Sequence, residues 1–187
     1  HGAAGKRADE RSCHGNAVSP GREIANKTVG VVGLGAIGQR TAKLAQAFGC
    51  KVIAWNRTPK NIEGVTLVDK ETLFKESDIV TLHIALNDET RNFVTAKEIE
   101  LMKPSAIIVN AARGPVINTN DLADALRNNR ISGAALDVYD VEPPLDKSNP
   151  FLDLSNTMLM PHIGFATEEA FELRLGIVVK NVEKFVL

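Results

Sequence analysis

The chain has 187 residues, of which 44% are hydrophobic and 24% charged, so its composition excludes a disordered or fibrous protein. Its 22 basic and 23 acidic residues nearly cancel, which leaves no broad electrostatic field to attract nucleic acid or an anionic membrane. The apolar runs are shorter than the roughly 20 residues of a membrane-spanning helix, and no leader pattern opens the chain. We therefore expect a cytoplasmic protein without nucleic-acid or membrane partners.

Residues 1–20 are polar, rich in glycine and without any period, which predicts an arm, a linker or residues foreign to the native protein. Residues 21–187 are predicted to form a single folded domain. The two cysteines, Cys13 and Cys50, are too few for a disulfide framework or a zinc site, so we expect no metal and interpret Cys50 as a small buried thiol.

From residue 27 onward, apolar segments of strand length alternate with segments of helical period. This alternation predicts repeated strand–helix units, and the mostly continuous apolar runs indicate strands covered on both faces, as in a parallel sheet. The expected fold class is α/β with a doubly wound parallel sheet. The predicted strands are residues 28–33, 51–56, 64–68, 78–84, 105–110, 133–138 and 157–161.

The stretch TVGVVGLGAIGQRTAKLAQAFG joins the first predicted strand to a helical pattern and contains Gly33, Gly35 and Gly38 in the spacing G-x-G-x-x-G. The first glycine permits a tight turn, the second lets a pyrophosphate approach the backbone, and the third lets helix and strand pack closely. A helix that begins near Ala36 then directs its free amides at the phosphates. This context predicts a Rossmann-type dinucleotide-binding domain over residues 21–187.

The residues Asn56, Arg57 and Thr58 follow the second predicted strand, about 20 residues beyond the last glycine, where Rossmann domains read the ribose 2′ position. NAD-selective sites place a carboxylate there, whereas an amide beside a guanidinium can pair with a 2′-phosphate. We therefore favour NADP(H) as the cofactor and keep NAD(H) as the alternative. In that alternative, Arg57 is a solvated loop cation.

Four further stretches each end a predicted strand: LHIALNDET, VNAARGPVIN, ALDVYDVEPP and MPHIGFAT. Ligands of doubly wound sheets bind at the carboxyl ends of the strands, so Arg113, Asp137, Glu142 and His162 are expected to converge there. The ordered motifs G-x-G-x-x-G, N-x-A-R-G, D-V-x-x-x-E-P and P-H-I-G run from Gly21 to near the C-terminus. This set resembles the D-isomer-specific 2-hydroxyacid dehydrogenases, most of all their glycerate dehydrogenase, hydroxypyruvate reductase and glyoxylate reductase branch.

The resemblance implies hydride transfer between a nicotinamide cofactor and a 2-oxo or D-2-hydroxy acid such as hydroxypyruvate or glyoxylate. It also implies a catalytic set of Arg113, Glu142 and His162. The arginine supplies a permanently charged fork for the oxygens of the substrate. Imidazole titrates near neutral pH, so His162 suits the role of acid and base, with Glu142 to orient it. His83 lies within a strand pattern and is interpreted as a core or supporting residue.

The resemblance also assigns the cofactor contacts. Backbone groups of the glycine-rich turn bind the pyrophosphate, a segment near residue 85 contacts the adenosine half, and the segment after residue 110 lies along the nicotinamide. Asp137 accepts a hydrogen bond from the carboxamide. The predicted cofactor-binding set is Gly33, Gly35, Ala36, Ile37, Gly38, Asn56, Arg57, Thr58, Ile84, Ala85, Thr90, Ala111, Ala112, Arg113, Asp137, His162 and Gly164.

Members of this family carry a second, substrate-binding domain, whereas only about 26 residues precede the first predicted strand here. We therefore expect a nucleotide-binding domain that binds cofactor and turns over little substrate alone. The resemblance further implies a homodimer. Two alternatives stay open: a dinucleotide-sensing, non-catalytic partner module resembling the C-terminal binding protein corepressors, and a minimal domain that only binds nucleotide.

Overall fold

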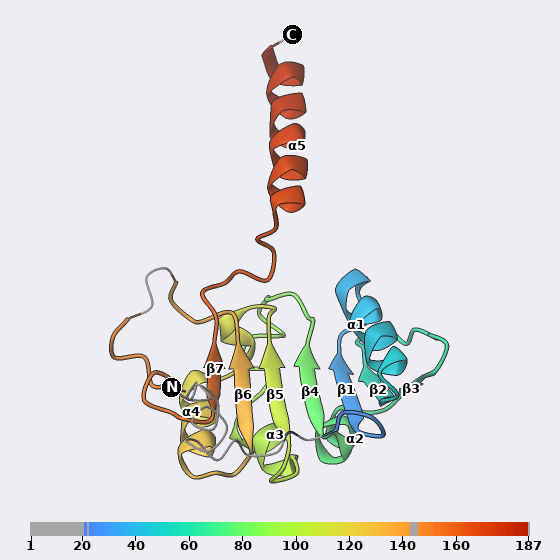
Figure 1. Cartoon of the computed structure of the whole chain (residues 1–187), viewed down its shortest axis with the longest axis vertical. Coiled ribbons are helices and arrows are strands. Elements are labelled where there is room, and N and C mark those ends of the chain that lie inside the picture. Colours follow the sequence, from blue (N-terminus) through green and yellow to red (C-terminus); the bar gives the residue numbers. More distant parts are fainter. Residues whose placement is uncertain (1–20, 22, 143–145, 187) are drawn as a thin grey trace, which may run out of the picture.

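The computed structural model describes residues 21, 23–142 and 146–186, so the predicted arm at residues 1–20 lies outside the described residues. A seven-stranded sheet in the order β3-β2-β1-β4-β5-β6-β7 forms its centre, and every neighbouring pair is parallel (Figure 1). The strands are β1 (Thr28–Val32), β2 (Lys51–Trp55), β3 (Val65–Leu67), β4 (Ile79–Leu82), β5 (Ile107–Asn110), β6 (Gly133–Leu136) and β7 (Thr157–Leu159). All seven predicted strands are confirmed. The order reverses between β1 and β4, which is the topological switch point of a Rossmann sheet.

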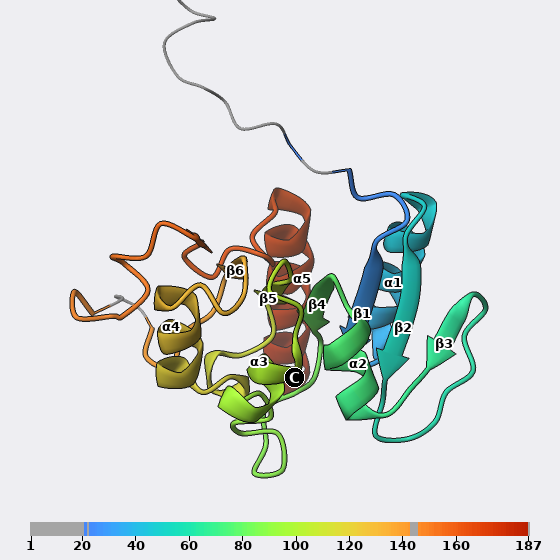
Figure 2. The ribbon, with the colours of Figure 1, turned by 90° about the horizontal axis from the view of Figure 1, so that it is seen from below.

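Helices cover both faces of the sheet. Figure 2 shows α1 on one face and α2, α3 and α4 along the other. Their bounds, with one 3₁₀ turn, are α1 (Ala36–Ala47), α2 (Lys70–Glu76), α3 (Ala96–Leu101), η1 (Gly114–Val116), α4 (Thr119–Arg127) and α5 (Glu168–Val186). Connections between parallel strands are right-handed, so the direction in which the chain moves along the sheet decides which face a helix covers. The chain moves one way from β1 to β2 and the opposite way to reach β4, so α1 and α2 lie on opposite faces. The predicted doubly wound fold is therefore confirmed.

The alternation of side chains along β1 divides the core into two clusters. Val29 and Val31 pack with Ala42 of α1 in the smaller cluster, which also contains the thiol of Cys50, as predicted. Val32 points to the other face and belongs to the larger cluster beneath α2, α3 and α4. Burial of one large apolar side chain contributes about 1.5–3 kcal/mol, so the larger cluster dominates the stability of the sheet.

Local sequence signals fix where α3 and α4 begin. The backbone N–H and the hydroxyl of Thr95 both donate to the Glu98 carboxylate, at 2.9 and 2.7 Å, which forms a capping box. Asn118 caps α4 through a hydrogen bond from the backbone N–H of Asp121. Arg130, just beyond α4, donates to the carbonyl oxygens of Met102 and Glu100 and so ties the end of α4 to the end of α3. These hydrogen bonds fix where α3 and α4 begin and hold the two helices against each other.

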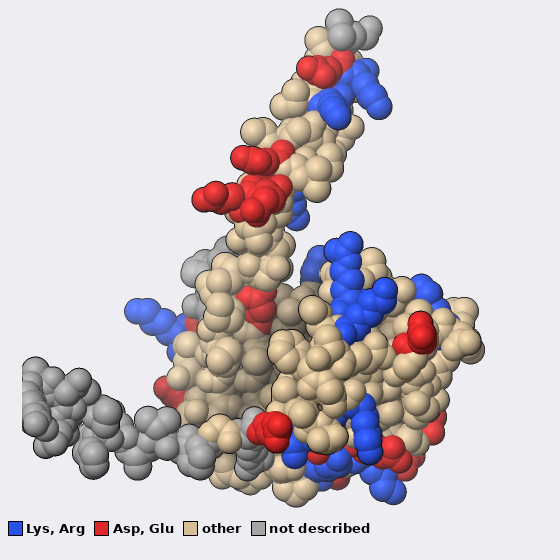
Figure 3. Space-filling view, turned by 45° about the vertical axis from the view of Figure 1, so that its right-hand side comes forward, with Lys and Arg blue, Asp and Glu red and all other residues tan. Residues whose placement is uncertain are grey.

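The helix α5 stands apart from the rest of the domain (Figures 1 and 3). None of its described side chains is buried, although it carries large apolar residues along its length. Its first turn holds Glu168 and Glu169, and its last turn holds Lys184, which suits the helix dipole. Within the part of the chain that the structure describes, no helix has the length and apolar character needed to cross a membrane.

Candidate functional site

The glycine-rich turn between β1 and α1 has the geometry of a phosphate cradle. Gly33 has a φ of +97°, which side chains rarely adopt, and its N–H donates to the carbonyl of Trp55 at 2.8 Å. A Cβ on Gly38 would overlap the carbonyl oxygen of Gly33, whereas a Cβ on Gly35 would meet no atom within 4 Å. The outer glycines therefore serve the fold, while Gly35 leaves open space in front of the first amides of α1. This arrangement fits a dinucleotide pyrophosphate.

A cavity of about 470 Å³ lies beside this turn, at the ends of β2 and β4. The rings of Trp55 and Phe93 lie 4.8 Å apart at one side and provide an apolar surface for a flat base. Asn56 accepts from the N–H of Leu34 at 2.8 Å and donates to the carbonyl of Thr58 at 2.6 Å. Asn56 therefore braces the phosphate turn against the loop after β2, in addition to lining the cavity.

Two exposed charges lie at the mouth of this cavity. The Arg57 guanidinium contacts the Glu89 carboxylate, with 3.0 Å between Nη1 and Oε2. On the same wall, the Thr90 hydroxyl donates to the carbonyl of Ala85 at 2.7 Å and accepts from the N–H of Asn87 at 2.8 Å. The turn after β4 is thus held rigid, and Ile84, Ala85 and Thr90 all line the predicted adenosine side.

A second cavity of about 390 Å³ lies between the phosphate turn and the end of β5. Asn110 holds the loop there by accepting from the N–H of Ala112 and donating to the carbonyl of Arg113, both at 3.0 Å. The exposed Arg113 guanidinium donates to the carbonyl of Ala112 at 2.6 Å. The lining residues are Ile37, His83, Ile84, Ala85, Leu86, Ala111, Ala112 and Arg113. The segment predicted for the adenosine half, near residue 85, and the segment predicted for the nicotinamide, after residue 110, therefore line one hollow.

His162 and Glu142 form a hydrogen-bonded pair, with 2.6 Å between Nδ1 and Oε2. The other carboxylate oxygen, Oε1, accepts from the backbone N–H of Tyr139 at 3.0 Å, so Glu142 is held at both oxygens. His162 has a φ of +56°, whereas the other non-glycine residues with positive φ in the described chain are all asparagines. Such strain is concentrated at functional sites. The pair leaves Nε2 of His162 as the nitrogen that can exchange a proton.

Tyr139 also supports this pair through its side chain. Its hydroxyl lies 2.9 Å from the carbonyl oxygen of Met160 and 3.2 Å from that of Leu136. Burial raises the pKa of the Tyr139 hydroxyl, which keeps it neutral and able to donate. The tyrosine thus links the end of β6 to the segment that carries His162.

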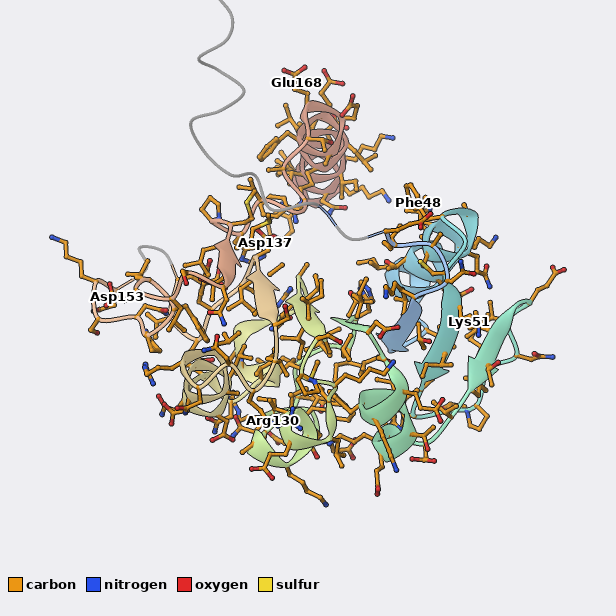
Figure 4. The ribbon with its side chains drawn as sticks, turned by 60° about the horizontal axis from the view of Figure 1, so that its bottom comes forward. Phe48, Lys51, Arg130, Asp137, Asp153 and Glu168 are labelled. Carbon is orange, nitrogen blue, oxygen red and sulfur yellow. The ribbon has the colours of Figure 1, made fainter. Side chains whose placement is uncertain are left out.

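Asp137 faces the same segment from the end of β6, where Figure 4 labels it. Its two carboxylate oxygens accept from the backbone N–H groups of Ile163 and Gly164, at 2.9 and 2.8 Å. A Cβ on Gly164 would lie 2.8 Å from one of these oxygens, so a side chain at this position would displace the Asp137 carboxylate. Asp137 therefore positions the loop that carries His162, while the carboxamide contact predicted for it stays a prediction.

Beside the dyad lies an apolar cavity of about 420 Å³. The ring of Phe165 meets the His162 ring edge to face, with 5.7 Å between the ring centres. The lining residues are Tyr139, Glu142, Leu152, Leu159, Met160, Pro161, His162 and Phe165. This apolar wall partly excludes water from one side of the hydrogen bond between His162 and Glu142.

The predicted site residues thus fall into neighbouring groups. The structure pairs Glu142 with His162 and gathers the adenosine and phosphate residues around the switch point. Arg113 lines a different cavity from the dyad, and within the described residues no hydrogen bond joins it to either partner. His83 is half-buried, bonds to the Thr81 hydroxyl at 3.0 Å, and has its pKa lowered by burial, in line with a supporting role.

Two residues that shape the site were missed from the sequence. Tyr139 lies within the D-V-x-x-x-E motif, but it contacts Glu142 through its backbone N–H. Every residue type except proline has this group, so the identity of the residue gave no signal. Glu89 pairs with Arg57 across 32 positions of sequence, and such a contact needs the fold to be known. Among the described residues, no group of three or more His, Cys, Asp or Glu side chains is arranged to hold a metal ion.

A glycine-rich turn at the switch point of a parallel sheet, with a hollow on each side of it, defines a Rossmann-type dinucleotide-binding domain. The comparison with family models agrees. The chain belongs to the D-isomer specific 2-hydroxyacid dehydrogenase family, whose NAD-binding domain matches residues 3–164. The predicted family is therefore confirmed, while the boundary that we predicted at residue 20 stays a prediction.

Individual relatives give the same result. The chain is 46% identical over 169 residues to a glyoxylate reductase of Thermococcus litoralis, which covers 88% of this chain and 50% of that protein. An acyclic imino acid reductase, solved with NADPH and D-Arg, has a TM-score of 0.80 and 39% identity over 88% of this chain and 52% of its own. The NAD complex of a D-isomer specific 2-hydroxyacid dehydrogenase from Lactobacillus delbrueckii ssp. bulgaricus has a TM-score of 0.79 and 33% identity over 88% and 54%. The chain thus spans about half the length of the relatives it matches.

Proposed function

We propose that this domain serves an oxidoreductase that interconverts a 2-oxo acid, such as glyoxylate or hydroxypyruvate, and the corresponding D-2-hydroxy acid. The observation that carries the proposal is the hydrogen bond between His162 and Glu142 at the same sheet edge as the glycine-rich turn. A bound nicotinamide cofactor supplies or accepts the hydride. The similarity to a glyoxylate reductase supports the choice of substrate class.

In this proposal each residue of the site has one task. His162 delivers a proton from Nε2 to the carbonyl oxygen of the substrate, because its Nδ1 is engaged by Glu142. The Glu142 carboxylate fixes that orientation and stabilises the positive charge of the imidazolium ion in the reverse direction. Arg113 leaves its contact with the Ala112 carbonyl and binds the carboxylate of the substrate through its fork of N–H groups.

We also propose that the domain accepts NADP(H) in preference to NAD(H), with Arg57 as the group that binds the 2′-phosphate. An exposed guanidinium beside an amide, with no carboxylate at the end of β2, supports this preference. We further propose a homodimer, as the family resemblance implies, and a cytoplasmic location, as the short apolar runs of the sequence lead us to expect.

Titration of NADH and NADPH against the 187-residue chain, followed by nicotinamide fluorescence, tests the cofactor part. We expect both to bind and NADPH to bind more tightly. Catalysis is tested with glyoxylate and hydroxypyruvate on the longest native form of the protein. There we expect the substitution His162→Gln to lower kcat by about 10²–10⁴-fold while cofactor affinity changes little. Absence of binding by either dinucleotide would remove the basis of the whole proposal.

A further inference from the structure

The ion pair of Arg57 and Glu89 lies at the edge of the cavity that is predicted to bind the adenosine half of the cofactor. The two side chains come from different loops, one after β2 and one after β4, and they meet with 3.0 Å between Nη1 and Oε2. Both line the cavity, yet both are about three-quarters exposed, at 75% and 73%. The pair therefore lies at the mouth of the cavity, where each partner can exchange the other for a ligand.

Both loops are braced, so the two charges are held near each other before any ligand arrives. Asn56, next to Arg57, is fixed by the N–H of Leu34 and the carbonyl of Thr58. The side-chain oxygen of Asn87 accepts from the N–H groups of Glu89 and Thr90, both at 3.0 Å. A rigid turn therefore sets where the Glu89 carboxylate can reach.

The end of β2 is the place where a Rossmann domain meets the 2′ position of the adenine ribose. In this chain the amide oxygen of Asn56 and one of its N–H groups form hydrogen bonds to the backbone. The next residue, Arg57, is therefore the side chain that can bind a ligand at this position. A guanidinium is well suited to a phosphate, since its planar fork can donate two parallel hydrogen bonds. The Glu89 carboxylate already occupies part of that fork.

The two cofactors differ here by one group, a 2′-hydroxyl in NAD(H) and a 2′-phosphate in NADP(H). The ribose hydroxyl of NAD(H) is neutral and can bind beside an intact pair, whereas a phosphate monoester brings about −1.5 to −2 charges at pH 7. To bind the phosphate, Arg57 must give up Glu89, and the carboxylate then remains close to a group of the same sign. An exposed ion pair is weak, so the exchange is feasible, but the repulsion persists.

We propose that Glu89 is a cofactor-specificity residue, which holds Arg57 in the absence of ligand and weakens the binding of NADP(H) relative to NAD(H). This inference rests on the proposed function, in that the cavity must bind a nicotinamide dinucleotide. The inference adds that Glu89, in the turn after β4, competes with the 2′-phosphate for Arg57, which follows β2. On this proposal, Arg57 and Glu89 together set the cofactor preference.

The test compares Glu89→Gln with Asp88→Asn, a matched removal of one exposed charge from the neighbouring position of the same turn. We expect Glu89→Gln to lower the Kd for NADPH about fivefold at low salt, with less than about a twofold change for NADH. Asp88→Asn should change both values by less than about twofold, because its effect is only a screened charge at a distance. The gain for NADPH should shrink as salt rises toward about 0.2 M.

The double variant Arg57→Ala/Glu89→Gln completes the cycle, and its NADPH affinity should exceed that of Arg57→Ala by much less than fivefold. Equal effects of Glu89→Gln and Asp88→Asn would overturn the inference, as would an undiminished fivefold gain in the absence of Arg57. An unchanged ratio of NADPH to NADH affinity in Glu89→Gln, with both cofactors bound, would overturn it while leaving the proposed function intact. Failure of the unsubstituted chain to bind either dinucleotide would overturn both.

Discussion

Tyr139 is the only tyrosine of the chain, and two of its groups support the hydrogen-bonded pair of Glu142 and His162. Its backbone N–H holds one oxygen of Glu142, while its hydroxyl holds the carbonyl of Met160, two residues before His162. A residue that holds Glu142 with its backbone and the segment before His162 with its side chain contributes more than its own bonds, because it limits how far the two partners can separate. Tyr139 is therefore a positioning residue for the dyad.

Removal of this hydroxyl by Tyr139→Phe should destabilise the domain by about 1 kcal/mol, since the partly buried hydrogen bond to the Met160 carbonyl is lost. We also expect the bond between His162 and Glu142 to lengthen, because the segment before the histidine is released. The Nδ1–H proton of His162, observed by NMR at low temperature, should move upfield in the variant. Glu142→Gln serves as the reference in which the charged acceptor is lost. A loss of stability with an unmoved proton resonance would reduce Tyr139 to a purely structural role.

At the scale of elements, the glycine-rich turn combines two different requirements within one motif. Gly33 and Gly38 are needed by the protein itself, since a positive φ and close contact with the backbone exclude a side chain at these positions. Gly35 has a φ of −68° and open space around it, so the fold alone would accept alanine. No contact among the described residues of the domain requires glycine at position 35, whereas a bound pyrophosphate would need the open space that it leaves.

The substitutions Gly35→Ala and Gly38→Ala should separate these requirements. Gly38→Ala is expected to destabilise the domain by about 2 kcal/mol or more, because strand and helix must move apart. Gly35→Ala should change stability by no more than about 0.5 kcal/mol, yet it should weaken dinucleotide binding by about tenfold or more, as its methyl group fills the space in front of the amides. Urea unfolding and NADH titration measure both effects. Tight NADH binding by a stable Gly35→Ala variant would contradict this assignment of the pyrophosphate.

Much of this level of structure follows from the sequence, because short-range patterns determine it. Continuous apolar runs predict the seven strands, and the Thr95–Glu98 capping box predicts the start of α3. The connection between β2 and β3 departs from the expected strand–helix alternation, since residues 56–64 are described throughout and contain no helix. Contacts such as Arg130 with the end of α3 were not predictable, because they depend on how neighbouring elements pack.

At the scale of the whole molecule, α5 is the element that the rest of the domain does not support. Five of its apolar side chains recur at spacings of four and three residues, and each of these five is more than half exposed. They are Phe171, Leu175, Val178, Val182 and Phe185. The spacing places them on one stripe of the helix, and such a stripe gains free energy only when another surface covers it. In the isolated domain, α5 therefore depends on the intrinsic helix propensity of its residues. Gly176 and the four β-branched residues between 177 and 182 lower that propensity.

We therefore expect the amides of α5 to exchange hydrogen at least about 100-fold faster than those of β4, which lies in the centre of the sheet. The substitution Gly176→Ala provides the internal test, since a Cβ there would meet no atom within 4 Å and the change favours helix by about 1 kcal/mol. It should slow exchange within α5 by a few fold and leave β4 unchanged, as measured by mass spectrometry on the 187-residue chain. Protection of α5 equal to that of β4 would show that the stripe is covered in solution. Dilution of the sample then decides whether a second copy covers it, because only an intermolecular contact weakens at low concentration.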